Sequence, residues 1–238
     1  MWVFFGQTLK NYQIMTTFFP AWCYECGCYI TDKKRSDSKY LCLDCHKTLP
    51  FFTKTICLKC GRSHSSINCN EEWAENISEF QTIFEYRNPV HKWISSLKYS
   101  RNLVTGKILQ GFVKKWFDGK KEYLRDIDLL IPVPVHKARL RSRGFNQSSY
   151  LLNTQTALKQ EHSIVRKTRN TSHQAGMSRT KRESNLKGVF EVSGAVKGKK
   201  VLLFDDVCTT GQTLSEISAC LKKAGATCID ALVISRTI

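Results

Sequence analysis

The chain has 238 residues, of which 42% are hydrophobic and 24% are charged, proportions that are ordinary for a globular protein and exclude a disordered one. Its formal net charge of +17 is not ordinary, and residues 129–182 carry most of it, with 11 Lys+Arg against 1 Asp+Glu. A concentrated basic block indicates a polyanionic partner or a multiply charged ligand, and the alternative is a solvated basic face.

Residues 1–20 form an aromatic-rich segment whose longest unbroken apolar run is Met1–Phe5. A signal peptide needs a basic stretch followed by an apolar one, and a membrane span needs about 18 apolar residues. Neither pattern occurs in the sequence, so we expect a cytoplasmic protein without membrane insertion. The aromatic residues of this segment favour an amphipathic lid on the protein over a membrane anchor.

Eight of the 11 cysteines lie between residues 23 and 69, and most of them form C-x2-C pairs. Paired cysteines are typical of a metal site in a reducing compartment and not of a secreted disulfide scaffold. Two such pairs offer four thiolates that can surround Zn²⁺ tetrahedrally. The predicted zinc ligands are Cys23, Cys26, Cys42 and Cys45.

The second set of cysteines, one ligand short of four, consists of Cys57, Cys60 and Cys69. The candidates for its fourth ligand are Cys28, His64 and Glu72. Because both sites would be saturated by protein ligands, we expect the zinc to be structural and not catalytic. Residues 21–77 are the expected zinc-ribbon module, since so short a stretch cannot bury enough apolar surface to fold without a metal.

From residue 78 onward the apolar pattern predicts alternating strands and helices. In chain order, the expected elements are a strand at 80–86, two helices within 89–117 that break near 100–102, a strand at 127–135, a helix at 146–160, a strand at 163–167, a long loop at 168–188, a strand at 199–206, a helix at 213–224 and a strand at 227–235. This alternation predicts a mainly parallel sheet with right-handed crossovers. Residues 78–238 are therefore the expected α/β domain.

The sequence VLLFDDVCTTGQTLSEI at 201–217 carries the clearest chemical signal. A hydrophobic strand ends in two carboxylates that can accept hydrogen bonds from sugar hydroxyls, although strand alternation allows one of them to organise the loop instead. The Thr-rich turn that follows offers backbone N–H groups and hydroxyls to a phosphate. Thr213 and Glu216 fit a capping box that would start the next helix near Leu214. The predicted ligand-binding residues are Asp205, Asp206, Val207, Cys208, Thr209, Thr210, Gly211, Gln212 and Thr213.

This stretch resembles the 5-phosphoribosyl-1-pyrophosphate (PRPP) signature of type I phosphoribosyltransferases. Three further features resemble the ComF/GntX family: IPVPVHKARLRSRGFNQS at 131–148, LKYSRN at 97–102, and the R-x2-N-x4-F spacing of Arg182, Asn185 and Phe190. The resemblance implies a type I phosphoribosyltransferase-like α/β fold, with a mainly parallel five-stranded sheet and flanking helices, behind an N-terminal zinc ribbon.

The resemblance also implies how the site is used. The acidic pair would bind the ribose hydroxyls and the turn would bind the 5-phosphate of PRPP, with Mg²⁺ held mainly by ligand oxygens and water. A loop at 133–144 would contact pyrophosphate, and a mobile loop at 168–182 would close over it. The basic residues expected to neutralise pyrophosphate or a DNA backbone are Lys137, Arg139, Arg141, Arg143, Arg169, Arg179 and Arg182.

Two functions of different classes stay open at this point. The resemblance implies handling of single-stranded DNA during natural transformation, with PRPP or a DNA 5′-phosphate as the bound ligand. The alternative is an active Mg²⁺-dependent phosphoribosyltransferase whose acceptor the sequence does not identify. The clustered basic residues favour a polyanion, and Trp93, Tyr99 and Phe145 are candidates to stack on bases. A weaker alternative makes the zinc module a docking surface for a helicase or another DNA-uptake protein.

Overall fold

The computed structural model describes residues 22–31, 36, 38–53, 57–61, 69, 71–153, 158–171 and 188–237. The chain divides into two compact units between Leu49 and Pro50. The larger unit therefore contains the second set of cysteines, and the expected 21–77 module stays a prediction. The N-terminal segment 1–20 lies outside the described residues. None of the helices within the described ranges is long and apolar enough to cross a membrane.

In the described part of the smaller unit, two cysteine-bearing turns lie next to a short helix. Trp22 and Tyr29 form an isolated antiparallel bridge across the first turn. Helix α2, Leu43–Lys47, has Cys42 as its N-cap, and the Cys42 sulfur accepts a hydrogen bond from the backbone N–H of Cys45 at 3.4 Å. A thiol at the N-cap satisfies one of the backbone donors that a helix start leaves free. Within the described residues of this unit, backbone geometry therefore contributes to holding the cysteines in place.

A four-stranded parallel sheet forms the centre of the larger unit. Its strands are β1 (Glu79–Glu85), β2 (Leu129–Pro132), β5 (Lys200–Cys208) and β6 (Cys228–Arg236), in the order β1-β6-β5-β2. Strands β2, β5 and β6 are buried almost throughout, which is the reason their sequences are continuous apolar runs. The predicted parallel sheet with flanking helices is confirmed.

The fifth strand implied by the family resemblance is reduced to one bridge among the described residues. Gln160 lies parallel to Leu130 of β2, and the bonds on either side run from Leu130 N–H to Lys159 C=O and from Glu161 N–H to Leu130 C=O. A separate two-stranded antiparallel sheet follows, made of β3 (Val165–Lys167) and β4 (Phe190–Val192). The chain thus leaves the main sheet after a single residue of pairing, and a full fifth strand is wrong for the described residues.

The helices agree with the sequence prediction in the first half of the domain. Helices α3 (Val90–Ser100) and α4 (Leu103–Gly119) break where expected, because Arg101 adopts a left-handed backbone with φ of 51° and Asn102 caps α4. The Asn102 side chain accepts from the N–H groups of Val104 and Thr105. The predicted break near 100–102 is therefore confirmed.

Two helix predictions need correction. The helix expected at 146–160 is α7, Gln147–Leu152, and it ends early because the chain must reach the bridge beside β2. The segment 133–144, expected as a loop, contains helix α6, Lys137–Arg143. His136 accepts from the Ala138 N–H at its start, and Gly144 ends it with a φ of +91°.

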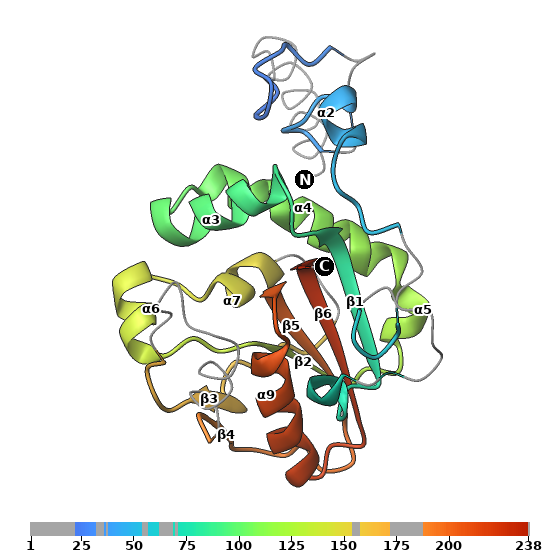
Figure 1. Cartoon of the computed structure of the whole chain (residues 1–238), viewed down its shortest axis with the longest axis vertical. Coiled ribbons are helices and arrows are strands. Elements are labelled where there is room, and N and C mark those ends of the chain that lie inside the picture. The colour runs from blue at the N-terminus through green and yellow to red at the C-terminus, as the bar shows by residue number, and fades with distance from the viewer. Residues whose placement is uncertain are drawn as a thin grey trace, which may run out of the picture. The chain divides into compact units, whose positions relative to one another are not determined.

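Among the described residues, the larger unit also contains the helices η2 (Glu72–Ala74), α5 (Lys121–Leu124) and α9 (Gln212–Lys223). Helix α9 presents Leu214, Ile217 and Leu221 to a core that includes Trp73 of η2 and alternate residues of β2, β5 and β6. Figure 1 shows α9 in front of the sheet, with α3 and α4 across its upper end. The carboxyl ends of β5 and β6 therefore point toward α3 and α7, where the candidate site lies.

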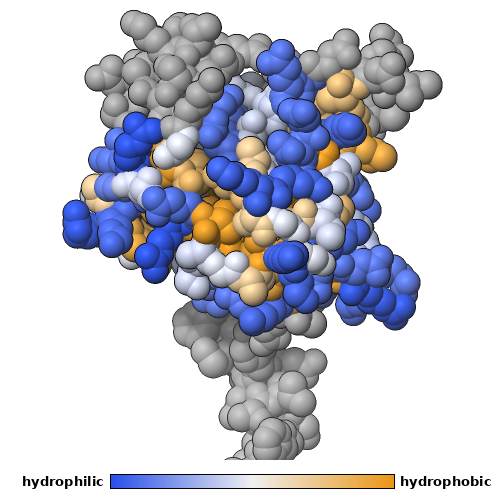
Figure 2. Space-filling view, turned by 90° about the horizontal axis from the view of Figure 1, so that it is seen from below, coloured by the Kyte–Doolittle hydropathy of each residue, from blue (hydrophilic) through white to orange (hydrophobic). Residues whose placement is uncertain are grey.

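The face of the molecule seen in Figure 2 has a mixed surface. Its hydrophobic side chains are set between hydrophilic ones in the part of the chain that the structure describes. Because more than half of a folded protein's surface is apolar, this pattern is ordinary. The charged and buried groups around the sheet are the more informative features.

Candidate functional site

Two neighbouring carboxylates near the carboxyl end of β5 are the centre of the site. Asp205 is 9% exposed and Asp206 is 3% exposed. Ligands of open parallel sheets bind outside this edge, so buried acids here need a functional or structural reason. Asp205 accepts hydrogen bonds from the Ser148 hydroxyl of α7 and from the Asp206 N–H, both at 2.9 Å. Burial and the neighbouring Asp206 charge raise the pKa of Asp205.

Lys98 on α3 pairs with the second carboxylate, and the sequence analysis missed it. Its Nζ lies 2.5 Å from Asp206 Oδ2, with side-chain exposures of 20% and 4%. Burial alone would lower the pKa of Lys98, but the attraction of Asp206 and then Asp205 outweighs it and raises that pKa. Lys98 sits in the LKYSRN stretch, which marked the family resemblance without indicating this contact. The pair thus stands as a buried salt bridge joining α3 to β5.

Three further cations lie around the acidic pair. Arg143 of α6 is close enough to Asp206 and Arg139 for both to affect its pKa, which burial lowers. The charges of Arg139 and Asp205 also affect the pKa of Lys167 of β3. Burial and the Arg139 charge lower this pKa to about 8. Arg139 also donates to the Thr171 carbonyl at 3.2 Å. Lys167 is a second residue that the sequence analysis missed.

Helix α6 sorts the expected basic residues into two groups. Arg139 and Arg143 are four residues apart, so they share a helix face, and both are half-buried. Lys137 and Arg141 share another face and are exposed, as is Arg169. Arg179 and Arg182 fall in a part of the chain that the structure does not describe. Their roles, like those of the described basic residues, stay predictions.

The turn after β5 differs from the predicted one in its helix start. Helix α9 begins at Gln212, and its N-cap is Gly211 with a φ of +79° and no side-chain cap. The capping box of Thr213 and Glu216 is therefore wrong: both residues already lie inside the helix, and Glu216 accepts from the Gln212 side chain at 3.3 Å. The first-turn N–H groups have no side-chain cap among the described residues, which leaves them available to an anion.

The residues of the turn differ in how far they are buried. Thr209 is exposed, Val207, Thr210, Gln212 and Thr213 are half-buried, and Cys208 and Gly211 are buried. A Cβ added at Gly211 would collide with the Trp73 ring. Glycine is thus required here both by the left-handed backbone and by this close packing.

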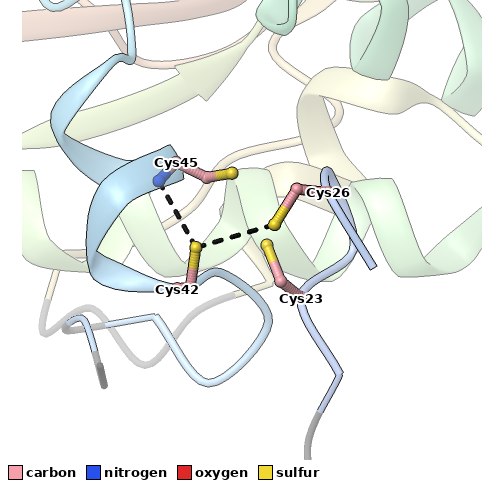
Figure 3. A group of neighbouring side chains, drawn as sticks. All are labelled: Cys23, Cys26, Cys42 and Cys45. Carbon is pink, nitrogen blue, oxygen red and sulfur yellow. Dashed lines mark hydrogen bonds between the residues drawn. The ribbon is translucent and has the colours of Figure 1, made fainter. Parts of the chain in front are cut away.

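Four cysteines of the smaller unit form a group that can hold a metal ion, as Figure 3 shows. The sulfurs of Cys23, Cys26, Cys42 and Cys45 all lie within 4.8 Å of one another. Cys26 Sγ and Cys42 Sγ are 3.8 Å apart. A tetrahedron with Zn–S bonds of about 2.3 Å has edges of about 3.8 Å, so this donor set fits zinc. The cysteines are free thiols and not disulfides.

The second group, Cys57, Cys60 and Cys69, also brings three sulfurs within 4.8 Å. Of the candidate fourth ligands, His64 lies beyond the described ranges. The Cys28 thiol is hydrogen-bonded to Cys26 and Cys42, so it belongs with the first group. The hydrogen bond to Cys26 is the largest of the effects that raise the pKa of Cys28 to about 12. Glu72 and Cys69 line a cavity of about 400 Å³. A metal at this second group stays a prediction with three protein ligands in place.

The three aromatic residues proposed to stack on bases have different environments. Trp93 is 2% exposed and belongs to the core, so a stacking role for it is wrong. Phe145 is half-buried and packs on Tyr150 with ring centroids 5.3 Å apart. Tyr99, at 78% exposure, is the candidate with an open ring face.

Comparison with known proteins agrees with this arrangement. A family model described as "Phosphoribosyl transferase domain" matches residues 153–236, which include the acidic pair and the turn. The chain also resembles a hypoxanthine phosphoribosyltransferase from Staphylococcus aureus at 16% identity and a TM-score of 0.34, over 52% of this chain and 61% of that one. That likeness is too slight to argue from.

Curated relatives cover most of the chain. It is 30% identical to the DNA utilization protein YhgH of Escherichia coli O6:H1 over an alignment of 198 residues that covers 78% of this chain and 86% of that protein. It is 27% identical to the competence protein ComFC of Streptococcus pneumoniae, over 81% and 86% of the two chains. It is 28% identical to competence protein F of Haemophilus influenzae, over 89% and 95%. Shared sequence over this much of both partners shows that the chain belongs to the ComF family.

Proposed function

We propose that the chain binds PRPP at the Asp205–Asp206 pair and handles single-stranded DNA in the cytoplasm during DNA uptake. The observation that carries the proposal is the buried acidic pair surrounded by Lys98, Arg143 and Lys167. The names of the relatives, a DNA utilization protein and two competence proteins, support the process. The free, clustered thiols support a reducing compartment.

Sugar recognition follows from the chemistry of the acidic pair. Carboxylates accept hydrogen bonds from vicinal hydroxyls, and a ribose offers two. Asp205 is held by Ser148 and by its neighbour's N–H, so its oxygens are already oriented. Lys98 neutralises Asp206, which lowers the cost of keeping two carboxylates together. The site is thus arranged for a polar, uncharged group between two acids.

Phosphate recognition uses the two sides of the acidic pair. The uncapped first turn of α9 suits the 5-phosphate, since helix starts attract anions. The cations Arg139, Arg143 and Lys167 suit the pyrophosphate, and Mg²⁺ would be held there mainly by ligand oxygens and water. A ligand carrying both groups, such as PRPP, matches this arrangement better than a single phosphate does.

DNA would follow the exposed face of α6, which carries Lys137 and Arg141. Tyr99 has an open ring, and Arg101 beside it donates to the Ser142 carbonyl of α6 at 2.6 Å. This hydrogen bond joins the end of α3 to the helix that carries Lys137 and Arg141. Exposed cations next to an aromatic ring are typical of surfaces that bind single strands without sequence preference.

A second candidate function is phosphoribosyl transfer, and Lys167 favours it. With a pKa of about 8, this side chain is partly neutral near physiological pH and can take a proton from an acceptor. Phosphoribosyl transfer to an acceptor releases pyrophosphate, which the neighbouring arginines would stabilise. Release of pyrophosphate from PRPP in the presence of an acceptor distinguishes this function from simple binding.

The test is a calorimetric titration of PRPP with Mg²⁺ and of a labelled single-stranded oligonucleotide, separately and in competition. We expect D205N/D206N to lose PRPP binding and to keep DNA binding. The triple variant R139A/R141A/R143A should weaken DNA binding equally for all sequences. It should also flatten the salt dependence, by about 0.7 in logarithmic slope for each phosphate that the variant no longer neutralises.

A matched control removes the same charge elsewhere. The exposed residues Lys114, Lys121 and Arg125 lie on α4, on α5 and next to α5, away from α6 in Figure 1. Their triple alanine variant should bind both ligands as the wild type does. PRPP affinity that is unchanged in D205N/D206N would overturn the phosphoribosyl site, and absence of DNA binding at low salt would overturn the DNA role.

A further inference from the structure

A buried arginine lies beneath the turn that follows β5. Arg236, the last residue of β6, is 0% exposed. Its Nε and Nη2 atoms have no hydrogen-bond partner among the described residues. Burying a guanidinium with donors unpaired is costly, so a residue of this kind needs a compensating interaction. The question is what its charge does in this position.

The third nitrogen is directed at the start of the turn. Arg236 Nη1 donates to Cys208 Sγ and, at 3.0 Å, to the Thr209 carbonyl oxygen. Cys208 and Arg236 are also the last register partners of β5 and β6. The position of Arg236 is therefore fixed by the sheet itself, and its reach to Thr209 does not depend on a flexible loop.

Aromatic rings hold the guanidinium in place. Its central carbon lies 4.9 Å from the centroid of Trp73 and 5.6 Å from that of Phe80. Guanidinium groups are attracted to such ring faces, and the attraction grows when water is excluded. The Trp73 ring is also the neighbour that leaves no room for a Cβ at Gly211. Trp73 and Arg236 thus form a common floor under Thr209 and Gly211.

This floor sets the direction of the backbone donors. In a planar trans peptide the carbonyl and the following N–H point in opposite directions. Because the Thr209 carbonyl accepts a hydrogen bond from Arg236, the N–H of Thr210 is directed away from Arg236. A phosphate on that side would meet an oriented donor, with a fixed positive charge beneath it in a medium of low dielectric.

We propose that Arg236 is the positioning residue of the phosphate turn and that Trp73 is its platform. The proposal rests on the proposed function, since it concerns the 5-phosphate end of the same ligand. Arg236 acts through Thr209 and through its charge, without touching the ligand. The ligand class is a phosphate monoester, and inorganic phosphate and ribose 5-phosphate are its simplest probes.

The experiment compares R236M, R236K and D205N/D206N with the wild type by titration of both probes. R236M keeps the volume and loses the charge. It should weaken both probes by the same factor, roughly tenfold to a hundredfold, as expected for a lost charge-assisted hydrogen bond. R236K keeps the charge and should recover part of that loss. D205N/D206N should weaken ribose 5-phosphate and leave inorganic phosphate within about twofold, because only the sugar contacts the acids.

A spectroscopic readout separates positioning from mere stability. The protein contains 5 tryptophans, so 5-fluorotryptophan labelling gives fluorine resonances in which W73F assigns Trp73. We expect the Trp73 resonance to move when phosphate binds to the wild type, and R236K to reduce that movement at equal thermal stability. This measurement decides the matter even if R236M does not fold, and R125M serves as the control for loss of an exposed arginine.

The outcomes distinguish the two proposals. If the wild type binds neither probe, the phosphate turn and the role of Arg236 both fall. If the wild type binds both probes and R236M binds them equally well, the role of Arg236 is overturned while the proposed function stands. Where R236M is unfolded, the same conclusion follows from equal binding by R236K. A uniform loss in R236M, partial recovery in R236K and a ligand-sensitive Trp73 resonance support the proposal.

Discussion

Replacing Lys98 by methionine tests the salt bridge that joins α3 to β5. The change removes the ammonium group and keeps most of the side-chain volume, so the principal loss is the charge beside Asp206. At 2.5 Å and an effective dielectric constant of about 20, the gross attraction of the pair is about 7 kcal/mol. Much of this is offset by the desolvation of both groups. The loss after removal of one partner from a buried pair is about 3–5 kcal/mol, and the partial exposure of Lys98 places our expectation near 3 kcal/mol.

Urea unfolding followed by circular dichroism measures this loss. We expect the free energy of unfolding of K98M at pH 8 to fall by about 3 kcal/mol, and that of K98M/D206N to fall by less than the sum of the two single variants. The pKa of Lys98 is raised in the folded state, so its contribution is complete below the ordinary lysine pKa of 10.5 and is lost as the pH rises through the higher folded value. The difference between wild type and K98M should therefore shrink in strongly alkaline solution.

An exposed lysine on the same helix provides the control. Lys92 lies on the solvent side of α3, and K92M should change the free energy of unfolding by less than about 0.5 kcal/mol. If the effects of K98M and D206N add to within about 0.5 kcal/mol, the two groups are not coupled and the interpretation of the pair is refuted.

Three further changes test other parts of the site. Burial raises the pKa of Asp205, so the fold loses stability as the pH rises through the pKa of the folded state. D205N should therefore raise the free energy of unfolding at pH 8 by on the order of 1 kcal/mol and change it little at pH 4. The same variant should weaken PRPP binding in calorimetry. G211A should lower the free energy of unfolding in urea by about 2–4 kcal/mol, because of the left-handed backbone at this position and the Trp73 contact. The control G111A in α4 should not lower it, and equal effects of the two variants would contradict the close packing. C42S should lower bound zinc, measured by elemental analysis, by about one equivalent per chain, while unchanged zinc would exclude the four-cysteine site.

The sequence predicted the elements that repeat a simple pattern. The apolar runs of β5 and β6 and the helical spacing of α3 and α4 led to the correct sheet and the correct helix break. The helix of α6 was missed because the family resemblance favoured a loop there, although His136 and Gly144 supply an N-cap and a left-handed stop. These two local signals in the sequence predict the helix better than the family resemblance does.

The cations around the acidic pair could not be found in the same way. Lys98 and Lys167 lie on different elements from the acidic pair, and only the packing of α3 and β3 near the sheet edge brings Lys98 to Asp206 and Lys167 near Asp205. Nothing in the sequence distinguishes them from other lysines of a strongly basic chain. Arg236 was overlooked because an arginine at the end of an apolar strand suggests exposure, whereas Trp73 and Phe80 cover it.

The position of β6 has a consequence for the order of folding. This strand lies between β1 and β5, so β1 lacks its parallel partner in the sheet until β6 has been synthesised, and its other edge carries only an isolated bridge between Phe51 and Phe84 among the described residues. Strand pairing over about 150 residues of chain carries a large loop-closure cost and is slow. During translation, the edge of β1 that pairs with β6 would therefore remain open on the ribosome, exposed to pairing with other chains. Truncation before β6 should leave an aggregation-prone product, since the gap falls in the middle of the sheet and not at its border.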